Sequence, residues 1–284
     1  MPASAQLVDY DQSEVVGINM GPTRTNLLAT AQRSLAAAGA HDRAGWIGLF
    51  TADGCVEDPV GSAPHRGQVA IGQFYDTFIG PRAISHHPHV DLVVGCTVVR
   101  DLELEIQMAS NLTLRVPTYI RYDLRADRDE LRVAGLSAYW ELPTMIRQFV
   151  RGGAGSVPAG IALGRNMFTN QGLSGSLGFL SGFRGLGTGG KGLFTRFLDE
   201  ICGGDEISVR RFATDIPITL GDTEPLTTSE LVKHLSGGSW HKLIRSGRAV
   251  VARVDRAGGH SMVFGDLATD RVAITRIRIF SETL

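Results

Sequence analysis

The sequence predicts an α+β fold in which helices pack on one face of an antiparallel sheet, and it predicts two tandem copies of that fold. The first observation is a change of period. Apolar residues recur at helical spacing up to residue 78 and at every second position from residue 90. Helices followed by a meandering sheet are the plan of an α+β domain. The second observation is that the same order of elements returns, in fewer residues, from residue 193 onwards.

Composition excludes several classes of function. Of the 284 residues 43% are hydrophobic, and 28 basic residues against 29 acidic ones leave a net charge of -1. A chain without a basic surplus lacks the charge for non-specific nucleic-acid binding, so we expect no nucleic-acid partner. No segment reaches the ~18 apolar residues of a membrane span. Three scattered cysteines and an N-terminus without the features of a signal peptide favour a cytoplasmic protein.

Three helices are predicted before the sheet, after a flexible arm over residues 1–22. Residues 26–38 are rich in alanine and leucine, and their apolar positions fall on one helical stripe. Residues 41–50 form a second, short helix, and residues 67–78 form a third. The aromatic residues of the third helix are Phe74, Tyr75 and Phe78.

The strands are predicted from alternation and from turn residues. A short strand over residues 55–58 ends at Pro59, because proline cannot continue a ladder of main-chain hydrogen bonds. Within residues 97–108 apolar residues alternate with glutamate and glutamine, the pattern of a half-buried antiparallel strand. The four later strands are predicted over residues 90–94, 97–108, 111–124 and 131–141.

A glycine-rich connector over residues 151–192 separates the first domain, residues 23–150, from the second. Its leucines at residues 173, 177 and 180 are spaced i, i+4, i+7, which predicts a short helix that docks on a neighbouring domain. A mobile lid and a segment that touches a membrane are the alternatives. The run over residues 185–192 imitates a phosphate-binding loop, but no strand precedes it and Gly192 stands where such a loop needs Ser or Thr.

Residues 193–284 are predicted to be a shortened second copy of the first domain. Residues 196–215 align without a gap on residues 34–53, and both segments end in Phe-x-x-Asp. Continuing the alignment places Leu220 where the first copy has Asp58. The second copy is therefore expected to play a structural part, either in an intramolecular pseudo-dimer or as a cover of the first domain, and a homodimer is the alternative.

The candidate catalytic group is the carboxylate of Asp58. Glu57 and Asp58 are adjacent on a strand, so their side chains point to opposite faces and one of them can face the hollow between helices and sheet. An acid in an apolar hollow has its charged form disfavoured, which raises its pKa and suits a general base near neutral pH. A simple Asp-Pro turn is the alternative. The aromatic residues expected around the carboxylate are Phe50, Phe74, Tyr75 and Trp140.

The segment around Asp58 resembles a known family. The run VEDPVGSAPHRGQVAIGQFY, residues 56–75, is similar without a gap to the signature segment of the Δ5-3-ketosteroid isomerases, of the nuclear transport factor 2-like (SnoaL-like) superfamily. The resemblance covers residues 26–143 and includes Ala138-Tyr139-Trp140. It implies a cone-shaped, strongly curved antiparallel sheet packed on helices, with the active site in the open mouth.

The resemblance also implies roles for individual residues. In that family an aspartate moves a proton between two carbons of a 3-ketosteroid, while a tyrosine and a protonated aspartic acid hold the enolate oxygen. Asp58 matches the base, and Tyr75 matches the tyrosine that supports the donor tyrosine. The donor tyrosine aligns with Ser34, and the protonated acid aligns with Asp123 if the hairpin has no gap. The remaining residues expected at the substrate are Phe50, Phe74, Phe78, Tyr119, Tyr122 and Trp140.

The oxyanion-binding half of this site has two possible alignments. Alternation of Ile120, Tyr122 and Leu124 favours an arrangement in which Asp123 faces away and Ile120 or Tyr122 takes the inner place. Tyr119 or Tyr122 could supply a donor, but only one of the two can point inward from a single strand.

These observations favour an enzyme that moves a proton through an enolate on a steroid-like or polycyclic enone, a steroid Δ-isomerase-like reaction without a cofactor. Another reaction of the superfamily, such as cyclisation, dehydration or epoxide opening, is one alternative. A non-catalytic binding protein for a sterol or another apolar molecule is the other. No metal is expected, because the run from His86 to His89 is predicted to be a solvated loop without a second group of ligands.

Overall fold

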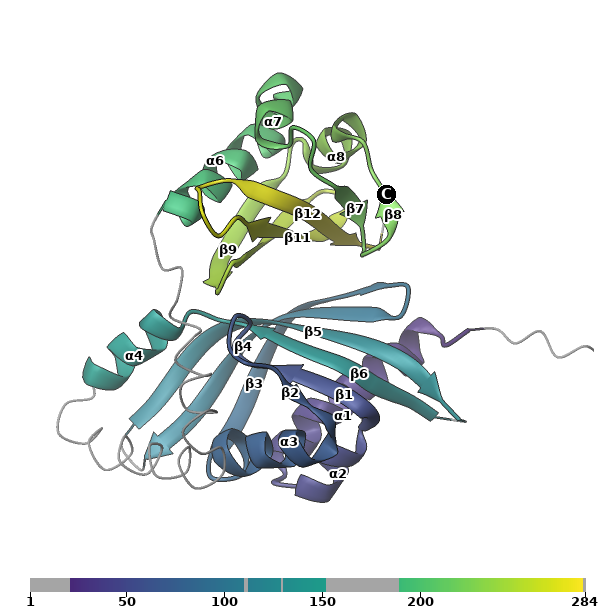
Figure 1. Cartoon of the computed structure of the whole chain (residues 1–284), viewed down its shortest axis with the longest axis vertical. Coiled ribbons are helices and arrows are strands. Elements are labelled where there is room, and N and C mark those ends of the chain that lie inside the picture. Colours follow the sequence, from purple (N-terminus) through teal and green to yellow (C-terminus); the bar gives the residue numbers. More distant parts are fainter. Residues whose placement is uncertain (1–20, 110–111, 129, 152–188, 283–284) are drawn as a thin grey trace, which may run out of the picture.

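The structure, a computed structural model, describes residues 21–109, 112–128, 130–151 and 189–282. These residues form two α+β units, one above the other, each with helices on one side of a six-stranded sheet (Figure 1). The predicted α+β class with two tandem copies is confirmed. Most of the predicted arm, the predicted docking helix and the first half of the phosphate-loop-like run lie outside the described residues.

The first unit begins with helices and ends with long strands, as its change of period predicts. Thr23 caps the first helix, because its hydroxyl oxygen accepts a hydrogen bond from the main-chain N–H of Asn26. The elements of this unit are α1 (Arg24–Gly39), α2 (Arg43–Gly48), β1 (Phe50–Glu57), β2 (His65–Arg66), α3 (Gly67–Phe74), a π-helical turn (Tyr75–Ile79), β3 (Ala83–Val94), β4 (Thr97–Ala109), β5 (Leu112–Asp127), β6 (Glu130–Tyr139) and α4 (Leu142–Arg151).

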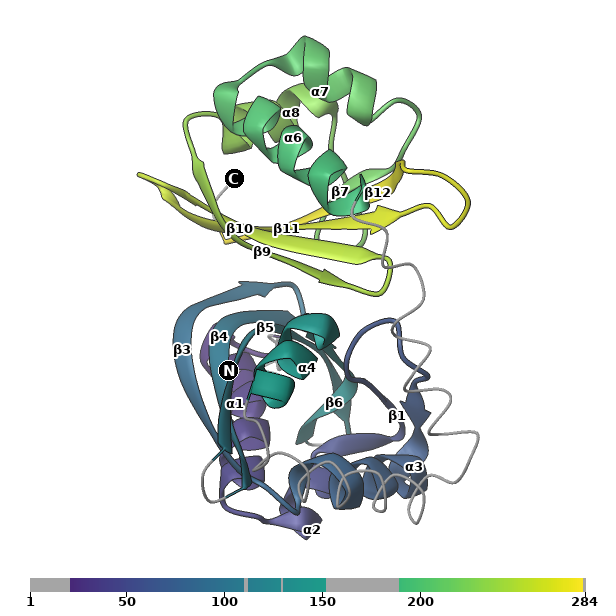
Figure 2. The ribbon, with the colours of Figure 1, turned by 90° about the vertical axis from the view of Figure 1, so that its left-hand side faces the viewer.

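The sheet of this unit is strongly bent, and its strand order is β2-β1-β6-β5-β4-β3. The longest strands, β3, β4 and β5, curve around α1 (Figure 2). The sheet is mixed rather than wholly antiparallel, because β1 runs parallel to β6, with Glu57 opposite Ser137. A parallel pair brings the carboxyl ends of both strands to the same edge, so the residues that follow β1 and β6 lie side by side.

Two elements differ from the sequence prediction. The strand expected over residues 90–94 begins at Ala83, because its first half pairs with β4 as far as Gln107. The run from His86 to His89 therefore belongs to β3 and is not a loop. The helix expected over residues 67–78 widens after Phe74 into a π-helical turn.

The second unit repeats the strand order of the first, as β8-β7-β12-β11-β10-β9, and again its first strand lies parallel to its last. No helix among the described residues has the length and apolarity needed to cross a membrane. The elements of this unit are α6 (Gly189–Gly203), α7 (Glu206–Phe212), β7 (Ile218–Leu220), β8 (Glu224–Pro225), α8 (Thr228–Leu235), β9 (Ser239–Ser246), β10 (Ala249–Arg256), β11 (Gly259–Leu267) and β12 (Ile274–Ser281).

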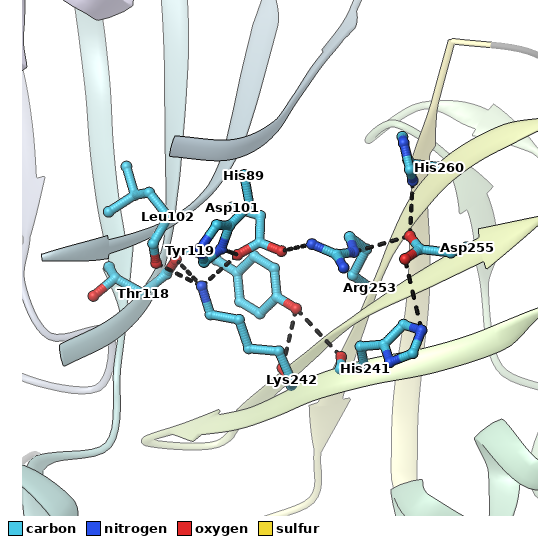
Figure 3. A network of polar contacts seen from close by, with 10 residues as sticks. All are labelled: His89, Asp101, Leu102, Thr118, Tyr119, His241, Lys242, Arg253, Asp255 and His260. Carbon is cyan, nitrogen blue, oxygen red and sulfur yellow. Dashed lines mark hydrogen bonds and ion pairs between the residues drawn. The ribbon is translucent and has the colours of Figure 1, made fainter. Parts of the chain in front are cut away.

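The two sheets face each other, and α1 to α3 of the first unit and α6 to α8 of the second lie on the far sides (Figure 1). An apolar layer between the sheets includes Tyr139 and Phe264, whose rings meet edge to face with centroids 5.2 Å apart. A buried polar network crosses the same interface: Asp101 of β4 binds Lys242 of β9 and, at 2.6 Å, Arg253 of β10 (Figure 3). The second unit thus covers the outer face of the first sheet and leaves its inner, helix-facing side to form a site.

Candidate functional site

A cavity of about 110 Å³ lies on the inner side of the first unit, between the π-helical turn and the bent strands. Most of its wall is aliphatic or aromatic, and the polar side chains on it belong to Asp58, Arg82 and Trp140. Apolar walls with a few polar groups are typical of small-molecule sites. The apolar lining residues are Phe74, Phe78, Ile79, Ile84, Leu104, Ile106, Met108, Val116 and Met145.

Asp58 reaches this cavity because of where β1 ends. It is the first residue after β1, and Trp140 is the first residue after β6, so the parallel pairing of the two strands brings them together. The indole Nε1–H of Trp140 donates to a carboxylate oxygen of Asp58 at 2.5 Å. Glu57 turns the other way and accepts a hydrogen bond from Gly61 N at 2.8 Å. The side chains of Glu57 and Asp58 therefore point to opposite faces of the sheet, as predicted.

The surroundings of Asp58 set its protonation. Loss of hydration in the apolar cavity raises the pKa of its carboxyl to about 6, and the hydrogen bond from Trp140 opposes this by favouring the ionised form. Asp58 is thus a carboxylate near neutral pH with a conjugate acid strong enough to return a proton. This balance is what a general base that both takes and returns a proton requires.

Aromatic side chains from α3 and the π-helical turn form one wall. The rings of Phe74 and Phe78 lie with centroids 5.1 Å apart, and His65 of β2 packs against Phe74 at 5.0 Å. Phe74 and Trp140 are buried, as expected for pocket walls. Of the residues predicted at the site, the structure brings four to this cavity: Asp58, Phe74, Phe78 and Trp140.

Four other predicted residues lie in the core beside the cavity rather than on its wall. Phe50 and Tyr75 pack on Trp46, with ring centroids 4.9 and 5.5 Å away. Tyr122 is fully buried, which raises its pKa to about 12, and its hydroxyl interacts with Ser34 of α1. Ser34 therefore contacts Tyr122 in the core and does not line the cavity.

Asp123 and Tyr119 lie on the opposite face of the sheet from Asp58. Alternation along β5 turns Ile120, Tyr122 and Leu124 inward, so the odd-numbered residues point to the second unit. The Asp123 carboxylate accepts from Arg121 at 2.6 Å, and the Tyr119 hydroxyl donates to the carbonyl of Lys242 at 3.0 Å. The prediction that Asp123 and Tyr119 belong to the site is therefore wrong, because strand alternation places both at the interface with the second unit.

Sequence reasoning missed several members of the site. Arg82 directly precedes β3 and Ile84 is its second residue, and the sequence predicts no strand over these positions. Met145 comes from α4, a helix that was not predicted, although its amphipathic spacing was available as a signal. The described residues contain no group of three or more His, Cys, Asp or Glu that could hold a metal.

In the second unit the place that corresponds to Asp58 holds a leucine and not a carboxylate. Leu220 ends β7, and its position matches the end of β1. The space between helices and sheet is filled by Phe194 and Phe197, both fully buried. A side chain at Gly265 would collide with the ring of Phe194, so this glycine makes room for it. The asymmetry leaves one candidate site, in the first unit, among the residues that the structure describes.

The sequence of the first unit matches a known protein family. The family described as nuclear transport factor 2 (NTF2) domain matches residues 27–147. Residues 27–147 therefore form an NTF2-like domain, called the NTF2 domain below. The second sheet, with its identical strand order, is consistent with a second NTF2-like copy in the same chain.

Solved structures similar to the NTF2 domain cover less than half of this chain. A Δ5-3-ketosteroid isomerase from Mycobacterium sp. is 28% identical, with 42% of this chain and 96% of that chain covered and a TM-score of 0.38. A Mycobacterium tuberculosis protein in complex with estradiol-17beta-hemisuccinate is 24% identical, with 42% and 96% covered and a TM-score of 0.38. An epoxide hydrolase from M. tuberculosis is 17% identical, with 46% and 94% covered and a TM-score of 0.40.

Proposed function

We propose that the NTF2 domain is an enzyme that moves a proton through an enolate intermediate on a steroid-like or polycyclic enone, with Asp58 as the base. The observation that carries the proposal is the Asp58 carboxyl, placed on the wall of an apolar cavity with its pKa raised to about 6. The membership of residues 27–147 in the NTF2 family supports it, and so does the resemblance of residues 56–75 to the ketosteroid isomerase signature.

The proposed reaction uses one carboxylate twice. The Asp58 carboxylate takes a proton from the carbon next to a carbonyl group, and the electrons of that C–H bond pass into the carbonyl, which becomes an enolate. The resulting carboxylic acid returns the proton to a different carbon, so the double bond shifts and the base is restored. Trp140 positions the carboxylate through its 2.5 Å hydrogen bond.

The direct test is conversion of a Δ5-3-ketosteroid, followed by the ultraviolet absorbance of the conjugated product. Asp58→Asn should lower the rate constant by about 10²–10⁴-fold, because the amide cannot accept the proton. Binding of the product steroid to D58N should persist, because the cavity keeps its shape. Equal rates in the two proteins would contradict the role of Asp58.

A non-catalytic binding function is favoured by one specific observation. The two residues that align with the family's donors to the enolate oxygen, Ser34 and Asp123, are not on the cavity wall. Under this alternative both the native protein and D58N bind a steroid and neither converts it. A cyclase, dehydratase or epoxide hydrolase reaction is the further alternative, and it predicts turnover of a different substrate that still depends on Asp58.

A further inference from the structure

Arg82 is a buried cation on the wall of the Asp58 cavity. Its side chain is 9% exposed, and it lies among the apolar residues of the π-helical turn and β3. One guanidinium nitrogen, Nη1, donates to the carbonyl oxygens of Thr77 at 2.7 Å and Phe78 at 2.8 Å. No Asp or Glu of the described residues forms an ion pair with it, which sets it apart from the other buried arginines, Arg100 and Arg121.

A guanidinium in this position is costly unless an anion compensates it. Removing a charge from water is unfavourable without a partner of opposite charge, and burial lowers the pKa of Arg82 for this reason. Arginine nevertheless stays protonated, and its five N–H groups form a planar fork that fits a carboxylate or another oxygen anion. The two hydrogen bonds to the π-helical turn use one nitrogen and hold the fork in place.

The cavity therefore contains a base and a cation but lacks the donors that the family resemblance implies for the enolate oxygen. Asp58 and Arg82 both line this cavity of about 110 Å³. Ser34 contacts Tyr122 in the core, and Asp123 is bound to Arg121 on the outer face.

We propose that Arg82 is the anion-binding group of this cavity, and that the ligand is an apolar ring molecule carrying an oxygen anion, a carboxylate or an enolate. The inference rests on the proposed function for the enolate, and it deepens that function by naming the group that receives the developing charge. In the reaction, the electron pair released when Asp58 takes the proton ends on the carbonyl oxygen. Arg82 then offsets the charge of that oxygen in a medium of low polarity, where such an interaction is strong.

The experiment compares two probes of the same ring system and nearly the same size, the anion 2-naphthoate and the neutral 2-naphthamide. Their affinities for the full chain are measured by calorimetry at a pH about one unit below the pKa of Asp58, which is about 6, so that Asp58 is mostly protonated and does not repel the carboxylate. The proteins are the native chain, Arg82→Gln, Arg82→Lys and Arg211→Gln. Arg211 is an exposed arginine of α7 in the second unit, so its variant controls for the loss of one positive charge.

The expected result is that the native chain prefers naphthoate and that R82Q loses about tenfold or more of the naphthoate affinity while its naphthamide affinity stays unchanged. R82K should keep part of the preference, since it keeps the charge without the planar fork, and R211Q should behave like the native chain. Thermal unfolding of each variant shows whether it is folded. If R82Q does not fold, the test uses the preference of the native chain for naphthoate over naphthamide and the reduction of that preference in R82K.

Three outcomes would overturn the inference. They are no binding of naphthoate to the native chain, no preference of the native chain for naphthoate over naphthamide, and an equal loss of affinity for both probes in R82Q. This test is separate from turnover. A protein that prefers naphthoate through Arg82 but converts no ketosteroid would refute the proposed isomerisation and keep the anion site. A protein that converts the steroid with R82Q as active as the native chain would refute the role of Arg82 in the reaction.

Discussion

Asp58 follows the last residue of β1, and its carboxylate meets the indole of Trp140 at the wall of an apolar cavity. The same desolvation that raises its pKa from 3.8 to about 6 also makes the ionised form costly to the fold. A group whose folded-state pKa is raised binds more protons in the folded than in the unfolded chain between those two values. The free energy of unfolding therefore falls as the pH rises from about 4 to about 6.

Replacing Asp58 by the neutral asparagine should remove this cost. At neutral pH we expect D58N to be more stable than the native chain by up to about 3 kcal/mol, the equivalent of the shift from 3.8 to about 6. The difference should shrink as the pH falls through 6 and vanish below the unfolded-state value of about 3.8. Denaturant unfolding at a series of pH values measures it, and a gain independent of pH would contradict the explanation.

At the scale of the elements, the alternation of β5 decides which of two predicted arrangements holds. Sequence periodicity alone indicated that Ile120, Tyr122 and Leu124 point inward, and the structure agrees. Asp123 and Tyr119 then belong to the outer face, which in this chain is not solvent but the interface with the second unit. A pattern of period two shows which residues share a face, whereas what covers that face depends on contacts between distant segments.

The first half of β3 and the end of α3 also show what a local sequence pattern cannot predict. Residues 83–89 carry histidine, proline and serine, which are poor local signals for a strand, and pairing with β4 overrides them. The helix signal over residues 67–78 was right in position but could not indicate the change to a π-helical turn. Arg82 lies between these two features, so one of the three polar side chains on the cavity wall could not be predicted from the sequence.

At the scale of the whole molecule, the second unit has the strand order of the first but a leucine, Leu220, in the place of Asp58. Its interior is filled by Phe194 and Phe197, and its sheet packs on the sheet of the NTF2 domain. Asp101, fully buried, joins the units through Lys242 and Arg253, and His89 of β3 lies 3.3 Å from the same carboxylate (Figure 3). We infer that the second unit supports the outer face of the bent sheet whose inner face forms the cavity.

Asp101→Asn should therefore destabilise the chain strongly, because it leaves two largely covered cations, Lys242 and Arg253, without the fully buried carboxylate that they share. We expect a loss of about 3 kcal/mol or more in the free energy of unfolding. Asp53→Asn is the matched control, since the Asp53 carboxylate pairs with Arg125 at the surface, where both side chains are more than half exposed, and such pairs contribute about 1 kcal/mol or less. Denaturant unfolding compares the two, and equal small losses would show that the Asp101 network does not hold the units together.

The state of the Asp58 carboxyl is the quantity on which the proposed chemistry depends. It is measured most directly by a pH titration of the side-chain carboxyl carbon of Asp58 by nuclear magnetic resonance, with the resonance assigned by its disappearance in D58N. A midpoint near pH 6 is expected from burial in the apolar cavity. A midpoint near 3.8, the value of an aspartate in water, would mean that the group faces solvent and would remove the basis for a general base at this position.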